Sequence, residues 1–403
     1  RGYDLIPYLA TFAGRIIDSP EDSVKFKKDF DATIKDLYKD IYYTTISKKL
    51  RAAHLTFLSE PYGGPWRQDD VIPLVHHVMT EFWTNEGVYS PYELEPTVAA
   101  LRKSDHNLIE SEAFTGQPAD SKWSEHPAWL KPIGDAAFCA GVNRMVLHRF
   151  VHQPWDDRYK PGNSMGQWGT HFDRTQTWWK PAKAMVVYWQ RCQALLQWGQ
   201  FKDGENDFSV TTNDSIKVKA IHRKLKTTDI YFVANTAREA GNAICTFKVS
   251  GMQPELWDPV TTTMHTLQRF DISNGTTSIT IPFDKAQSFF VVFRKKLDGL
   301  LSARKLITTG VKELSTLSGA WKVQFDSAWG GPAKSVVFNM LQDWTSNNNE
   351  GIKYYSGTAI YTKTFDVPLK PKADKNSTLY LDLGLVNHIA RVLLNGKNLG
   401  VVW

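Results

Sequence analysis

Four polar residues mark the ends of short apolar runs in the first 150 residues of the chain. Glu60 ends the run "LTFLSE", Glu81 lies in "HHVMTEFW", Glu112 lies in "NLIESEAF", and His148 lies in "RMVLHRFVHQ". They follow one another at intervals of 21, 31 and 36 residues, about the length of one βα repeat. Carboxyl groups in such an arrangement can carry out acid/base chemistry on a glycosidic bond, in which one acid protonates the leaving oxygen and one carboxylate activates water or attacks carbon.

Glu112 is the strongest catalytic candidate of the set. A single glutamate at a strand end more often caps a helix or forms a salt bridge, but three in corresponding positions favour the catalytic interpretation. Ile109 and Phe114 are predicted to give Glu112 an apolar setting of the kind that raises a carboxyl pKa. Glu110 would share the face of Glu112 in an ideal strand and is its main competitor.

The chain is rich in aromatic residues, with 15 Trp, 15 Tyr and 21 Phe. Aromatic residues often line carbohydrate sites because sugar rings stack on them, although large β-rich cores use many of them too. The Gly-rich segment "PGNSMGQWGTHFDRTQTWW" lacks the spacing of a phosphate-binding loop, so it is predicted either to line a site for a polyhydroxylated ligand or to be a structural loop. The predicted substrate-binding residues are Glu60, Trp83, His148, His152, Trp155, Trp168, His171 and Arg174.

The pair His148 and His152 allows three interpretations: hydrogen bonding to sugar hydroxyls, metal binding, or a polar core. Their i, i+4 spacing is that of zinc-binding helices, but they precede "QPW" in a strand-to-loop context. Metal binding is therefore the least favoured of the three, and the metal ligands stay unassigned.

Composition and motifs exclude several other classes of function. A net charge of +6 over 403 residues, without a basic run, argues against nucleic acid as a partner. No run of about 18 apolar residues occurs, so no membrane span is predicted. The three cysteines have no CxxC spacing and indicate neither a disulfide framework nor a zinc site. Because no GxSxG motif is present, acyl transfer is disfavoured.

The elements that would position the polar residues change character along the chain. Alternating helical and strand-like segments, including a long helix over residues 23–54, predict parallel βαβ units over residues 1–200. In a (β/α)8 barrel, side chains from the carboxyl ends of different strands converge on one face. Residues 201–296 predict about six strands of a β-sandwich, and residues 297–316 predict a linker. A second β block covers residues 317–403, where "NGK" between apolar runs predicts a hairpin turn.

Several long segments resemble a known family. "RGYDLIPYLATFAGR", "LSEPYGG", "TEFW", "SEAFTG", "GVNRMVLHRFVHQPW" and "WGTHFDRTQTWW" closely resemble the α-L-rhamnosidases of glycoside hydrolase family 106, and the likeness continues through "IYFVANT", "WDPVT" and "SFFVVFRK". Residues 317–403 resemble the galactose-binding-like, jelly-roll module of the glycoside hydrolase 2 type. The resemblance implies an α/β plus all-β protein, in which part of a (β/α)8 barrel precedes a β-sandwich and a truncated jelly roll.

The resemblance also implies an activity, namely the inverting removal of terminal α-L-rhamnose from plant pectin-type glycans or rhamnosides with the aid of calcium. Glu112 matches a glutamate of the catalytic pair, as acid or base, and Glu81 matches another active-site glutamate, whereas the calcium ligands are not placed. The family carries its second catalytic glutamate in a "DSWE"-like strand just before "RGYDL", so the chain is expected to begin after it. A periplasmic or secreted location is suggested. The alternative hypothesis is a carbohydrate-binding or scaffold protein with a catalytically incomplete barrel.

Overall fold

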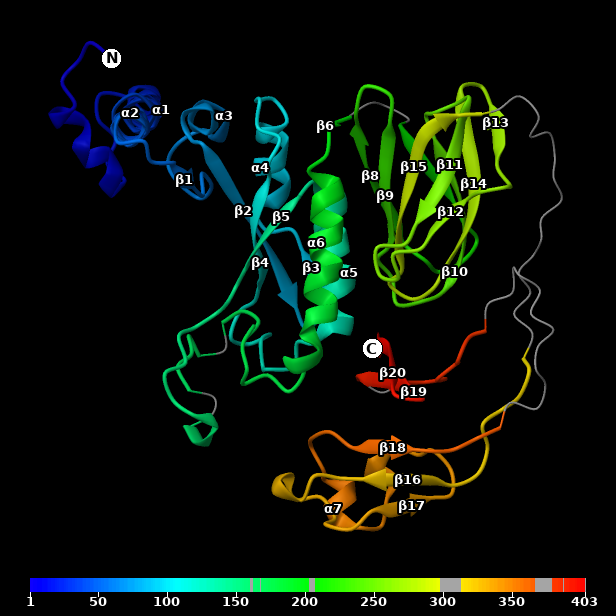
Figure 1. Ribbon diagram of the computed structural model, residues 1–403. Coiled ribbons are helices and arrows are strands. Elements are labelled where there is room, and N and C mark those ends of the chain that lie inside the picture. Colours follow the sequence, from blue (N-terminus) through cyan, green and yellow to red (C-terminus); the bar gives the residue numbers. More distant parts are fainter. Residues whose placement is uncertain are drawn as a thin grey trace. The chain divides into compact units, whose positions relative to one another are not determined.

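The structure divides into two units. The computed structural model describes residues 1–159, 162–166, 168–202, 207–297, 313–366, 379–386 and 388–402 (Figure 1). One unit lies within Arg1–Lys305 and Asn387–Trp403, and the other lies within Leu306–Val386. The fold is mixed α/β, with one largely parallel sheet and several antiparallel sheets. The predicted linker, 297–316, lies mostly outside the described residues.

A parallel sheet organises the first 200 residues. Its strands run in the order β1-β2-β4-β5, with parallel pairing throughout. They are β1 (Leu58–Ser59), β2 (His77–Asn85), β4 (Glu110–Thr115) and β5 (Arg144–Leu147). β3 (Val88–Ser90) folds back on the end of β2 through Glu86 and Gly87, whose φ angles of 49° and 82° are those of a tight hairpin turn.

Helices cover one face of this sheet and leave the other polar. The covering helices are α4 (Leu94–Leu101), α5 (Pro127–Ala140) and α6 (Lys183–Leu196). Val78, Phe82 and Ala113 are buried in one core with residues of these helices. Because side chains alternate along a strand, Glu81 and Glu112 lie on the opposite face. The strand–helix alternation predicted for this region is confirmed.

The amino-terminal helices precede the sheet. They are η1 (Ile6–Ala13), α1 (Pro20–Leu37), the π-helical segment η2 (Tyr38–Tyr43) and α2 (Thr44–Ala52), and α3 (Gln68–Val71) follows β1. The Ser19 hydroxyl caps α1 by accepting the backbone N–H of Asp22 at 3.0 Å. α1, η2 and α2 follow one another without a break, which confirms the predicted long helix. Among the described residues, no helix is long and apolar enough to cross a bilayer.

Two antiparallel sheets follow and pack face to face. Their orders are β13-β14-β10-β7 and β12-β11-β15-β9-β8-β6. The strands are β6 (Gln200–Phe201), β7 (Phe208–Thr211), β8 (Val218–Lys224), β9 (Asp229–Asn235), β10 (Gly241–Phe247), β11 (Met252–Trp257), β12 (Met264–Thr266), β13 (Asp271–Ser273), β14 (Thr276–Phe283) and β15 (Ser288–Lys296). Tyr231, Val233 and Phe293 of the larger sheet share a core with Phe247 and Ile279 of the smaller sheet.

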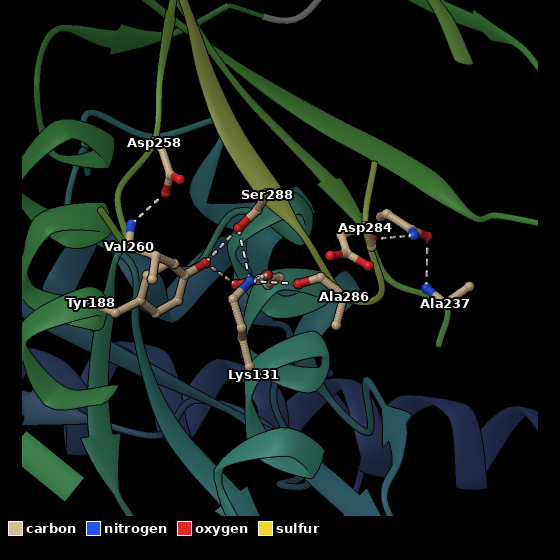
Figure 2. A network of polar contacts seen from close by, with 10 residues as sticks. Lys131, Tyr188, Ala237, Asp258, Val260, Asp284, Ala286 and Ser288 are labelled. Carbon is tan, nitrogen blue, oxygen red and sulfur yellow. Dashed lines mark hydrogen bonds and ion pairs between the residues drawn. The ribbon is translucent and has the colours of Figure 1, made fainter. Parts of the chain in front are cut away.

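The larger of these sheets also packs on α5 (Figure 1). Phe232 of β9 belongs to the same core as the helices, so β9 is buried on both faces. At this contact the Lys131 ammonium donates to the Ala286 carbonyl (2.6 Å) and the Ser288 hydroxyl (3.0 Å), and it pairs with Asp135 at 2.7 Å (Figure 2). The larger antiparallel sheet therefore packs on α5, and α5 packs on the parallel sheet.

The remaining elements form a small sheet and a hairpin. The second unit contains β16 (Trp321–Gln324), β17 (Val336–Phe338), β18 (Ile360–Thr362) and α7 (Glu350–Lys353), around a core of Val323, Phe325, Phe338, Ile352 and Tyr355. β19 (Ala390–Leu394) and β20 (Lys397–Val402) form the hairpin. Its turn residues Asn395 and Gly396 have φ angles of 50° and 78°, which confirms the turn predicted from "NGK".

Candidate active site

Glu81 and Glu112 lie side by side on the polar face of the parallel sheet. The pairing of β2 with β4 sets the two residues opposite each other in register. Glu81 is 8% exposed, and Glu112 is partly buried. Both lie inside their strands and not at the carboxyl ends predicted from the sequence, because each strand continues beyond its glutamate. Glu60 and His148 do follow directly on the ends of β1 and β5, as predicted.

The surroundings of this pair favour a proton on one of its carboxyl groups. Burial and, second, the negative charge of Glu112 raise the pKa of Glu81 to about 7. The pKa of Glu60 is raised by burial first and by the charge of Glu112 second. Within the described ranges, neither Glu81 nor Glu112 forms an ion pair with a Lys or Arg side chain. A carboxyl group that titrates near neutral pH can both donate and accept a proton, as acid/base catalysis requires.

Tyr62 holds the Glu81 side chain from the loop after β1. Its hydroxyl donates to Glu81 Oε2 at 3.0 Å, and this hydrogen bond lowers the pKa of Glu81 against the larger effect of burial. The pKa of Tyr62 itself is raised by burial and by the charges of Glu81 and Glu60, so it remains a donor. The sequence analysis missed this residue. Its position two residues after Glu60, in "SEPY", is the signal that could have found it.

A β-bulge at Phe114 orients Glu112. The register with β2 slips here, so that Phe82 pairs with Ala113 and the next pairing skips to Thr115. Phe114 has a φ of 66°, which for a bulky residue costs about 1–3 kcal/mol. Its ring is fully buried in the helix-covered core and does not supply the apolar setting predicted for Glu112.

The residue after the bulge turns back toward the catalytic candidate. The Thr115 hydroxyl donates to Glu112 Oε1 at 2.6 Å. The ring of Phe114 meanwhile stacks on Trp189 of α6, with ring centroids 5.0 Å apart. Core packing of the Phe114 ring thus offsets the backbone strain at Phe114. The bulge also places the Thr115 hydroxyl where it can donate to Glu112. This donor could not be predicted from the sequence, because a bulge depends on pairing with another strand.

His148 faces Glu112 from the end of β5. Its Nδ1 lies 3.9 Å from Glu112 Oε1 and has no hydrogen-bond partner among the described residues. Burial lowers the pKa of His148; the charge of Glu112 opposes that effect and the charge of Arg149 adds to it. The His148 ring is therefore mainly neutral at neutral pH. When the ring is protonated, its positive charge can balance the negative charge of Glu112.

Glu110, the competitor of Glu112 on β4, is engaged elsewhere. Its Oε1 accepts from Arg144 at 2.9 Å, and its Oε2 lies 3.1 Å from Nδ1 of His77. The carboxylate is buried, so these two partners balance a charge that would otherwise be costly to bury. Glu110 has the environment of a structural ion pair, whereas Glu112 does not.

Aromatic side chains stand beside the glutamate pair. Trp83 lies two residues after Glu81 on β2 and stacks on Tyr92 with centroids 5.2 Å apart. The ring of Trp168 meets Trp83 edge-on at 6.2 Å and is 40% exposed. The structure thus brings together two of the predicted substrate-binding residues, Trp83 and Trp168, and Trp83 in turn contacts Glu81.

Three other predicted residues lie apart from this group. His152 and Trp155 are exposed on the segment after β5, and Arg174 donates to the backbone carbonyls of Gln153 and Trp155. None of the contacts found for the described residues joins them to the glutamates. The pair His148 and His152 is also divided, since the first is mostly buried and the second is exposed.

His171 supports a loop from inside. It is 2% exposed, stacks on Trp123 at 4.2 Å, and accepts from Nη2 of Arg149 at 2.6 Å. Burial first and the charge of Arg149 second lower the pKa of His171 to about 4, so the ring stays neutral. A side chain this deeply buried packs the loop and does not present a surface to a ligand.

One kind of metal site is not found among the described residues. No group of three or more His, Cys, Asp or Glu side chains in the described part of the chain is arranged to hold a metal ion. Backbone carbonyls, side-chain amides and water also bind calcium, so the calcium implied by the family resemblance stays a prediction.

Similar proteins include a solved structure and a protein known from its sequence. A solved rhamnosidase from Novosphingobium sp. PP1Y matches 100% of the chain with a TM-score of 0.82 and 23% sequence identity, which shows a common fold. A Formosa agariphila protein named "Putative beta-glucuronidase" is 26% identical over 438 residues, covering 75% of the chain. The chain spans 52% of the solved rhamnosidase and 37% of the Formosa protein.

The family itself follows from a match over most of the sequence. The model of glycoside hydrolase family 106, described as alpha-L-rhamnosidase, matches residues 1–204 and 201–272. These segments include both glutamates of the pair and the strands that carry them. The chain therefore belongs to glycoside hydrolase family 106.

Proposed function

We propose that this chain supplies catalytic residues for the hydrolysis of terminal α-L-rhamnose, with Glu112 in the acid/base pair and Glu81 controlling its protonation. The observation that carries the proposal is the placement of two carboxyl groups in register on adjacent strands, one of them with a pKa of about 7. Family membership supplies the class of reaction. A pKa matched to neutral pH, produced by burial and a like charge, is typical of catalytic carboxyl groups.

The spacing of the pair supports a division of roles. Inverting glycosidases keep acid and base about 6.5–9.5 Å apart so that a water molecule fits beside the sugar. Neighbouring strands lie about 4.8 Å apart, and a hydrogen bond with Glu112 contributes to the raised pKa of Glu81. The two glutamates are too close to be the acid and base of one inverting pair. The family resemblance implies a different second member, the glutamate of the "DSWE"-like strand.

Glu112 is suited to the role of general base. The Thr115 hydroxyl and, when it is protonated, the Glu81 carboxyl group both donate toward it. In the proposed step, Glu112 takes a proton from water, the water oxygen bonds to the anomeric carbon, and the bond to the leaving oxygen breaks as the acid protonates that oxygen. His148 can stabilise the charge on Glu112 across 3.9 Å.

The aromatic residues beside the pair suit a sugar ring. Trp83 and Trp168 present faces and edges on which the apolar side of a rhamnose ring can stack. The substrate proposed is a plant pectin-type glycan or a rhamnoside, met in the periplasm or outside the cell. Calcium dependence is proposed on the family resemblance alone.

The test is the release of nitrophenol from para-nitrophenyl α-L-rhamnoside, with and without a chelator. It should be run on the 403-residue chain and on a form that also carries the "DSWE"-like strand. We expect hydrolysis by the longer form and its loss in Glu112→Gln. Para-nitrophenyl β-D-glucuronide is the control substrate. Cleavage of the glucuronide alone would overturn the choice of sugar, and sugar binding by a folded longer form that cleaves neither substrate would favour the carbohydrate-binding alternative.

A further inference from the structure

A short backbone strap runs beside the end of β5. The Thr170 N–H donates to the His148 carbonyl at 3.1 Å, and the Arg149 N–H donates back to the Thr170 carbonyl at 2.6 Å. The Gly169 N–H donates to the carbonyl of Gly116, just past the end of β4, at 3.0 Å. These bonds hold the backbone of residue 169 against His148, close to the strand that carries Glu112.

Gly169 leaves no room for a side chain. A Cβ atom at this position would lie 2.2 Å from Nδ1 and 2.8 Å from Cε1 of His148, and 3.0 Å from the His148 carbonyl oxygen. Cβ atoms do not approach other atoms to 2.2 or 2.8 Å, so the imidazole would have to move. The φ of Gly169 is also positive, at 65°, a conformation that glycine adopts readily.

The contact involves the ring nitrogen that faces Glu112. His148 Nδ1 is the atom nearest the missing Cβ, and the same atom lies 3.9 Å from Glu112 Oε1. The ring is therefore enclosed between the Gly169 backbone on one side and the Glu112 carboxylate on another. A displacement of about 1 Å in an active site can lower a rate by about 100-fold.

We propose that Gly169 is a positioning residue, whose lack of a side chain keeps the His148 imidazole in place against Glu112. The proposal rests on the proposed function only in treating Glu112 as catalytic. Gly169 itself touches neither substrate nor reacting atoms, and it acts through His148.

Gly166 provides a matched control on the same loop. Its φ is also 65°, but a Cβ there would meet nothing within 4 Å. Gly166→Ala therefore carries the same backbone strain without the contact to His148. We expect Gly169→Ala to lower kcat/KM about 10- to 100-fold and Gly166→Ala to change it by no more than about twofold. The loss in melting temperature should be small in Gly166→Ala and larger in Gly169→Ala, because only the second variant also has the contact with His148. Equal effects on kcat/KM would overturn the proposal.

A second measurement does not depend on activity. NMR titration of His148 reports its environment, in which Glu112, Arg149 and His171 are the charged or titratable neighbours. Displacement toward water in Gly169→Ala should move the pKa of His148 up toward its ordinary value, with no such change in Gly166→Ala. An unchanged titration would contradict the proposal even if rhamnoside hydrolysis is never detected, so the two failures are distinguishable. In a His148→Ala background, Gly169→Ala should cost no more activity than Gly166→Ala.

Discussion

Two buried glutamates have different surroundings and opposite pKa shifts: Glu81 in the parallel sheet and Glu255 in the antiparallel layer. Glu255 on β11 is 3% exposed, and it accepts from Arg294 Nε at 3.0 Å and from the Trp257 indole at 2.9 Å. Burial alone would raise its pKa, but these hydrogen bonds outweigh burial and lower it. Glu81 is almost as buried, yet its neighbour is a second carboxyl group and its pKa rises to about 7.

The comparison separates structural carboxylates from candidate catalytic ones. A buried charge is normally given a partner, because an unpaired one is costly. Glu110 follows this rule on the same strand as Glu112, through Arg144 and His77. Glu81 and Glu112 have no Lys or Arg partner among the described residues. Burial and the charge of Glu112 instead raise the pKa of Glu81 to about 7. We propose that this unusual pair of carboxyl groups marks the catalytic site.

The largest expected effect on kcat/KM comes from comparing Gln variants of the two glutamates of β4, Glu110 and Glu112. In the form that hydrolyses the rhamnoside, Glu112→Gln should lower kcat/KM by about 10²- to 10⁴-fold, because a general acid or base is lost. Glu110→Gln should leave kcat/KM within about tenfold, because it removes an ion pair and not a catalytic group. Measuring kcat/KM for both variants checks the contrast. A larger loss of kcat/KM in Glu110→Gln than in Glu112→Gln would contradict the assignment of Glu112 as the catalytic residue of β4.

The next effect concerns Glu81 and pH. Folded protein keeps a proton on Glu81 up to about pH 7, whereas the unfolded chain releases it near the ordinary value of 4.5. Stability should therefore fall as pH rises from about 4.5 to about 7, by on the order of 3 kcal/mol. Glu81→Gln should abolish this fall and also the ionisation near pH 7 in the profile of kcat/KM. Chemical denaturation across that pH range is the check, and an unchanged slope in the variant would contradict the assignment.

A smaller effect should follow from Tyr62→Phe. Removing the hydroxyl that donates to Glu81 Oε2 deletes a hydrogen bond that favours the charged carboxylate. The pKa of Glu81 should rise further, so the limb of the kcat/KM profile near pH 7 should move to higher pH. The rate at its optimum should change only severalfold. A shift to lower pH would show that Tyr62 does not act on Glu81.

The smallest effect on activity is expected at Glu255. Glu255→Gln removes a charge from the pair with Arg294, so the free energy of unfolding should fall by about 1–3 kcal/mol. Hydrolysis should be unaffected, because Glu255 lies in the antiparallel layer. Denaturant unfolding combined with the nitrophenol assay separates the two outcomes. A variant that is fully stable but inactive would reverse the comparison.

The features that could be predicted from the sequence are those with local causes. The helix over 23–54 follows from its periodic pattern, and the hairpin at Asn395 and Gly396 follows from turn residues that favour positive φ. Glu112 could be singled out by its place near the end of an apolar run. Its register with Glu81 could not, because pairing between strands joins residues 31 positions apart.

The roles of the residues around the glutamates could not be predicted from the sequence for a similar reason. Tyr62 and Thr115 act through hydrogen bonds that exist only once β1, β2 and β4 are aligned. Gly169 is one of several glycines in its loop, and only the approach of His148 distinguishes it. Conversely, His171 has the residue type of a ligand-binding side chain but is buried against Trp123.

A carbon-13 NMR titration of the glutamate carboxyl groups, assigned with Glu81→Gln and Glu255→Gln, tests directly whether Glu81 and Glu112 share a proton near neutral pH. We expect one carboxyl group with a midpoint near pH 7 that disappears in Glu81→Gln, and a lower midpoint for Glu81 when the neighbouring charge is removed in Glu112→Gln. Glu255 should titrate below its ordinary range. A Glu81 midpoint below that of Glu255 would contradict the account.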